Sequence, residues 1–284
     1  MGAGARLAAA CASCGCGDPT LTAMGVEKPL DNRIRLSVEE RFGGHSDGDP
    51  NNEEDSWTLR SSLAVSWSPL ARLTVAALVP VVTGWDKTGP EPWHHYTMLG
   101  DAELSLRGVI VEDRRWSPRH LVSLLVGLKM PTGPRAYDET GNPVPDDLQP
   151  GSGSWDPFVG AGYAWFGAEF SFFSSLSYRL TTPGRGNYQH GQSLGGTAGV
   201  QFQPLGVLAF SLSADVRWAA ADSIGNLPAP DTGGAMLAIT PSLIVAPVER
   251  WLIKLSAQLH VADAFIGRQS EAHALILSTV VDLN

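Results

Sequence analysis

Hydrophobic and polar residues alternate through most of the chain after Leu30. Leu63, Val65 and Trp67, for example, share one parity, and Ser62 and Ser66 have the other. A period of two is typical of a β-strand with two different faces, and helical spacing is not sustained anywhere. The pattern predicts about twelve strands, at residues 33–39, 57–67, 73–81, 101–110, 122–130, 159–165, 170–180, 193–203, 208–218, 236–246, 251–261 and 275–283.

The connections between these strands alternate in length. Those after the even-numbered strands are short: 68–71, 112–118, 166–168, 203–206 and 246–250. Those after the odd-numbered strands are mostly longer and polar: 43–56, 83–97, 132–154, 181–191, 219–233 and 262–270. Short turns at one end and long loops at the other are typical of bacterial outer-membrane barrels, in which the turns are periplasmic and the loops extracellular.

The tryptophans support a membrane barrel. All nine lie near a predicted strand end or in a connection, and five share the apolar parity of their strands: Trp57, Trp67, Trp165, Trp218 and Trp251. Aromatic girdles at the two membrane interfaces have this placement, whereas a soluble β-sandwich would bury its tryptophans in mid-strand. We predict an all-β fold, a transmembrane antiparallel β-barrel of about 12 strands over residues 30–284, in the bacterial outer membrane; a soluble sandwich is the alternative.

Composition narrows the choice of partners. The chain is 43% hydrophobic and 17% charged, which is atypical of disorder, and its net charge of −9 argues against nucleic acid. No stretch approaches the 18 or so apolar residues of a transmembrane helix. The expected partners are outer-membrane lipid and a small-molecule solute.

Charged residues on the polar face predict a hydrated lumen, because both signs of charge can pair there. The candidate selectivity residues are Arg107, Lys129, Arg179, Asp215, Arg217 and Lys254. The Pro- and Gly-rich segment 148–157 precedes a predicted strand and either folds into the lumen or only fixes the strand register. In the first case it would narrow the pore with Leu148, Gln149, Trp155 and Asp156.

The N-terminal segment, residues 1–29, is interpreted as the remnant of an export signal, because Arg6 precedes a short apolar run. It holds all three cysteines, Cys11, Cys14 and Cys16, in a CxxCxC pattern. Four interpretations are open: a remnant that is cleaved away, a lipid attachment site, a metal site of three thiolates, and a disulfide that leaves one thiol over. The cluster is the one candidate cofactor site, and it could also attach a periplasmic partner.

Other motifs offer little chemistry. The acidic loop 45–55 lacks the residue order of a calcium-binding EF-hand, and the pair His94-His95 stands in a Pro-rich loop. Residues 44–48 (GHSDG) and 191–195 (GQSLG) have the letters of Gly-x-Ser-x-Gly, but neither joins a predicted strand to a helix, so no hydrolase elbow is predicted; the sequence has no HExxH motif. A lipid-facing hydrolase would need a serine matched to His273, and none is evident. A function without catalysis is therefore expected.

Four segments carry a family resemblance: 127–132 (GLKMPT), 147–166 (DLQPGSGSWDPFVGAGYAWF), 174–192 and 231–247. They resemble the bacterial outer-membrane family assigned to transport in the MetA pathway of phenol degradation. The resemblance implies an outer-membrane channel for small hydrophobic or aromatic solutes. The final residues, Asp282-Leu283-Asn284, lack the aromatic end usual for such barrels, so we expect either an atypical assembly signal or an incomplete C-terminus.

A rival hypothesis gives the barrel a structural role. In it, the barrel is a scaffold for a periplasmic or surface metal or redox partner, attached through Cys11, Cys14 and Cys16.

Overall fold

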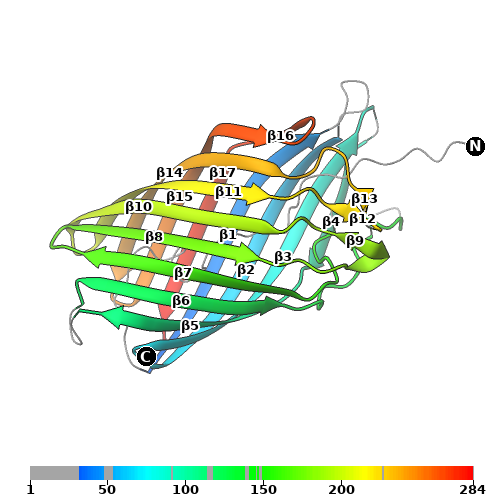
Figure 1. Cartoon of the computed structure of the whole chain (residues 1–284). Coiled ribbons are helices and arrows are strands. Elements are labelled where there is room, and N and C mark those ends of the chain that lie inside the picture. Colours follow the sequence, from blue (N-terminus) through cyan, green and yellow to red (C-terminus); the bar gives the residue numbers. More distant parts are fainter. Residues whose placement is uncertain are drawn as a thin grey trace, which may run out of the picture.

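The long elements of the protein are all β-strands (Figure 1). The computed structural model describes residues 32–47, 54–90, 92–113, 118–137, 141–144, 146, 149–225 and 227–283. The strands are β1 (Arg33–Asp47), β2 (Glu54–Leu70), β3 (Leu73–Thr88), β4 (His94–Leu99), β5 (Glu103–Glu112), β6 (His120–Lys129), β7 (Asp156–Phe166), β8 (Phe170–Arg179), β9 (Tyr188–Gln189), β10 (Ser193–Leu205), β11 (Leu208–Ala219), β12 (Ser223–Ile224), β13 (Leu227–Pro228), β14 (Gly234–Val248), β15 (Trp251–Phe265), β16 (Gln269–Glu271) and β17 (Ala274–Asp282). One short 3-10 helix, η1 (Arg185–Asn187), precedes β9.

The main sheet closes into a barrel. It has 14 strands, but β4 and β5 both pair with β3, and β16 and β17 both pair with β1, so each of these two pairs forms one interrupted barrel strand. The described residues therefore form twelve barrel strands, all paired antiparallel, and β1 closes the barrel by pairing with both β2 and β17. The predicted transmembrane barrel of about 12 strands is confirmed.

The two faces of the wall have opposite polarity. Leu63, Leu124 and Leu212 point outward and remain 47–51% exposed, whereas Ser123 and Ser278 point inward and are buried. A soluble sandwich would bury these leucines, so the arrangement is that of a barrel whose outer wall faces lipid. The outward parity predicted for Leu63, Leu124 and Leu212 is confirmed, and the low overall charge is consistent with this apolar outer wall.

The two ends of the barrel differ as predicted. Tight turns at 71–72, 206–207 and 249–250 lie at the end where Arg35 of β1 pairs with Asp282 of β17 (Figure 1). At the opposite end, most of the predicted loops 43–56 and 83–97 is strand. The strands β1, β2 and β3 continue past the apolar band, and β4 pairs with the end of β3, for example at Trp85 and His95. Polar residues occupy both faces of this extension, so the sequence shows no period of two there.

The N-terminal segment, residues 1–29, with Cys11, Cys14 and Cys16, lies outside the described residues. The division of the chain at residue 30, the four interpretations of the cysteines and the scaffold hypothesis therefore stay predictions. No helix in the described part of the chain is long and apolar enough to span a membrane.

Candidate functional site: the mouth and lumen of the barrel

The candidate site lies beside a break in the barrel wall, between β4 and β5. Pro80 of β3 has no N–H to donate, and opposite it the chain leaves the sheet between β4 and β5. The N–H of Gly100 donates to the carbonyl of Pro80 at 2.8 Å. A Cβ on Gly100 would lie 2.6 Å from the carbonyl oxygen of Pro150, so only glycine lets the loop between β6 and β7 approach here. The break directs Asp101 into the protein, where it is buried.

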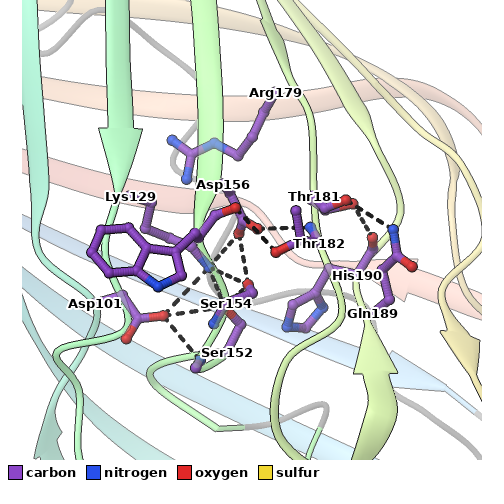
Figure 2. Close-up of polar contacts among 12 residues, drawn as sticks. Asp101, Lys129, Ser152, Ser154, Asp156, Arg179, Thr181, Thr182, Gln189 and His190 are labelled. Atoms are coloured by element: carbon purple, nitrogen blue, oxygen red, sulfur yellow. Dashed lines mark hydrogen bonds and ion pairs between the residues drawn. The ribbon is translucent and has the colours of Figure 1, made fainter.

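Asp101 and Asp156 enclose a buried lysine (Figure 2). Lys129 Nζ, at the end of β6, lies 2.5 Å from Asp156 Oδ2 and 3.4 Å from Asp101 Oδ2. The side chain of Lys129 is 5% exposed, and those of the two carboxylates are 2% exposed. A buried charge is tolerated only when partners satisfy it, so the lysine and the carboxylates depend on each other.

Loop hydroxyls complete this cluster. Ser152 Oγ donates to Asp101 Oδ2 at 3.1 Å and Ser154 Oγ donates to Asp156 Oδ2 at 3.0 Å, while Lys129 also donates to Ser152. Figure 2 shows the five side chains converging from β6, β7 and two loops. We call Asp101, Lys129, Ser152, Ser154 and Asp156 the mouth network. Its members join the loop between β6 and β7 to the barrel wall at the loop end.

The same loop folds into the barrel. Its Ala136 and Val144 pack against Val82 and Tyr96, which are buried on the inner face of β3 and β4. Gln149, which is 2% exposed, fixes the loop: its Oε1 accepts from the N–H of Ala136 at 2.7 Å, and its Nε2 donates to the carbonyls of Ala136 at 3.2 Å and Val144 at 2.5 Å. The loop therefore lines the mouth from inside.

A second cluster joins the next two loops. Asp222 accepts hydrogen bonds from the hydroxyl of Tyr188 and, at 2.7 Å, from the N–H of Gly191; His190 Nδ1 lies 3.2 Å from its Oδ2. The strands β9, β12 and β13 form a small separate sheet beside it. These residues were not among the predicted site residues, because loop contacts between segments more than 30 residues apart have no periodic signal in the sequence.

The predicted lumen residues occupy several environments. Lys129 belongs to the mouth network, and Arg179 pairs with Glu103 at 2.8 Å and lies over the ring of Phe158 at 5.0 Å. Arg217 pairs with Glu271 of β16. Asp215, Arg107 and Lys254 lie on inward positions of β11, β5 and β15.

The predicted constriction is only partly described. Gln149 and Asp156 are buried, Trp155 is 53% exposed, and Leu148 lies outside the described residues. The side chains of Gln149 and Asp156 fix the loop inside the mouth. Whether the loop narrows the path of a solute stays a prediction.

Metal binding has no candidate in the described part of the chain. No group of three or more His, Cys, Asp or Glu side chains is placed there to hold an ion. Most of the acidic loop 45–55 lies outside the described residues, and His94 and His95 form part of β4.

Comparison with known proteins identifies the fold. No protein-family model and no curated protein matches significantly. An outer-membrane channel from Pseudomonas putida F1 aligns with a TM-score of 0.68 at 12% identity, over 90% of this chain and 98% of that one. The translocator domain of the autotransporter NalP from Neisseria meningitidis has a TM-score of 0.51 at 10% identity, covering 92% and 91%. A mutant of the monoaromatic hydrocarbon channel TodX has 0.50 at 9%, covering 98% and 96%.

These similarities show the fold of bacterial outer-membrane β-barrels. Together with the outward-facing leucines, they place the chain among outer-membrane barrels. The more specific resemblance to the phenol-degradation family stays a prediction.

Proposed function

We propose that the protein is an outer-membrane channel that passes small solutes through a polar lumen of mixed charge. The observation that carries this proposal is the inversion of the wall: an apolar surface faces lipid, and charged side chains occupy inward positions of many strands. Such inward positions on β1, β2, β5, β6, β8, β11 and β15 hold Arg35, Arg41, Arg60, Arg107, Lys129, Arg179, Arg217 and Lys254.

Mixed charges favour a hydrated interior over a dry one. A dry core would have to pair every charge with ideal geometry, whereas water solvates charged groups and lets a polar solute pass. The inward face of β8 and β10 is lined with small polar residues, Ser175, Ser177 and Thr197, which also leave room in the lumen. These features support passage through the barrel rather than a sealed structural core.

The finer proposal is that the solutes are small and hydrophobic or aromatic. The resemblance of segments 127–132 and 147–166 to the phenol-degradation family supports this class. The similarity in fold to the TodX channel supports the same class.

Reconstitution tests the proposal. Purified protein in planar bilayers should give stepwise ionic conductance, and liposomes that contain it should take up toluene and benzoate faster than empty liposomes do. The matched controls are heat-unfolded protein and empty bilayers. Absence of both conductance and uptake, in protein that keeps the gel mobility of a folded barrel, would contradict a channel function and leave the barrel fold intact.

A further inference from the structure

Two arginines face each other across the seam between β1 and β2. Arg41 and Arg60 are directly paired in the antiparallel register, and both have the inward parity of their strands. Side chains at such positions are about 5 Å apart at Cβ, and like charges directly opposite are destabilising. The pair lies well inside the barrel, between the Arg35–Asp282 contact at the turn end and the His45–Glu271 pairing at the loop end.

Further charges surround this pair. The charge of Arg41 is repelled by Arg60 and Arg217 and attracted by Glu39 and Asp215. Lys254 is attracted by the same two carboxylates. Arg41 also donates from Nη2 to Oε1 of Gln258 on β15 at 2.5 Å, a contact between residues 217 apart in sequence. We call Arg41, Arg60, Arg217, Lys254, Glu39 and Asp215 the lumen cluster.

Asp215 and Glu39 accept hydrogen bonds from hydroxyl groups, and the neighbouring Glu271 forms an ion pair. Asp215 accepts from the hydroxyls of Thr197 at 2.8 Å, Thr240 at 2.5 Å and Ser213 at 3.4 Å. Glu39 accepts from Ser278 at 3.1 Å. Glu271, beside the cluster, pairs with Arg217.

We propose that Arg41 and Arg60 bind the carboxylate of a small organic monoanion as it crosses the lumen. The inference rests on the proposed channel function and names its substrate class. Guanidinium groups match carboxylates in shape and bind them through two parallel N–H···O bonds. An anion between the two arginines would relieve their mutual repulsion.

Equilibrium dialysis of the detergent-solubilised full chain against radiolabelled benzoate tests the site without requiring conductance. Benzoate should bind more tightly than its neutral analogue benzamide. Arg41→Gln and Arg60→Gln should each weaken benzoate binding about tenfold, and Arg41→Lys should weaken it less, because it keeps the charge and loses the planar fork. Arg119→Gln, in the exposed turn between β5 and β6, is the matched control and should bind as the wild type does.

The outcomes separate the inference from the channel function. Selective loss of benzoate binding in the Arg41 and Arg60 variants, with gel mobility of a folded barrel retained, supports the site. Equal binding in every variant, equal binding of benzamide, or no binding to the wild type would overturn it. Conductance in planar bilayers is measured on the same preparations; a conducting protein that binds no benzoate keeps the proposed function and loses the inference.

Discussion

The mouth network and the lumen cluster differ in how their cations are arranged. In the mouth network one cation, Lys129, is enclosed by two carboxylates and two serine hydroxyls, and its side chain is 5% exposed. In the lumen cluster two cations, Arg41 and Arg60, lie directly opposite each other on neighbouring strands. The first arrangement is complete without any solute, whereas the second gains from the arrival of an anion. Charged residues therefore stabilise the structure in the mouth network, whereas in the lumen cluster they are placed to bind a solute.

The largest difference in the free energy of unfolding should come from removing one lysine charge from each region. Lys129→Met leaves Asp101 and Asp156 buried without their cation, and we expect the free energy of unfolding to fall by about 3–5 kcal/mol. Lys254→Met, the matched change in the lumen cluster, should cost less than about 1 kcal/mol, because water can solvate the groups that remain. Urea unfolding in lipid vesicles, followed by tryptophan fluorescence, measures both. Equal losses would contradict the distinction between the two regions.

A smaller effect should follow from disturbing the packing of the mouth. A Cβ on Gly84 would lie 2.3 Å from the ring of Tyr96, so Gly84→Ala must displace the ring that supports the inward-folded loop. We expect a destabilisation of about 1–3 kcal/mol and faster proteolysis of the loop between β6 and β7. Gly108→Ala is the control, since nothing lies within 4 Å of its Cβ position. If the two variants are cleaved at the same rate, Tyr96 does not hold the loop.

The smallest effect concerns two adjacent carboxylates on opposite faces of β1. Glu39 points into the lumen, whereas Glu40 points outward and accepts a hydrogen bond from Ser61 at 2.6 Å. Glu39→Gln should raise the chloride-to-potassium permeability ratio roughly twofold, because it removes negative charge beside Arg41. Glu40→Gln should leave the ratio unchanged. Reversal potentials in a salt gradient give both values, and a similar shift in the two variants would show that the lumen charge does not set selectivity.

Much of the architecture was predictable from parity alone. A period of two, repeated over segments of about ten residues, specifies both the strands and the face that each residue occupies. Lys129 and Arg179 could therefore be assigned to the lumen from the sequence. The alternation of short and long connections then identified the two ends of the barrel.

The partners of these residues could not be predicted, because they depend on how loops fold and on strand register. Lys129 meets Asp101 only because the chain breaks between β4 and β5, and it meets Ser152 only because a loop turns inward. Arg41 was missed because three charged residues in succession, Glu39, Glu40 and Arg41, interrupt the alternation. Its pairing with Arg60 follows from the register of two strands, which the pattern of either strand alone does not contain.

The seam between β1 and β17 has a consequence for the order of assembly. Arg35 donates to both carboxylate oxygens of Asp282, at 2.6 and 2.9 Å, across 247 positions of sequence. This contact cannot form until the last barrel strand is in place, so the other hairpins can pair first and the ring closes late. Until the seam closes, the free edges of β1 and β17 are open to pairing with other chains. We therefore expect closure of the seam between β1 and β17 to be the last step of barrel assembly.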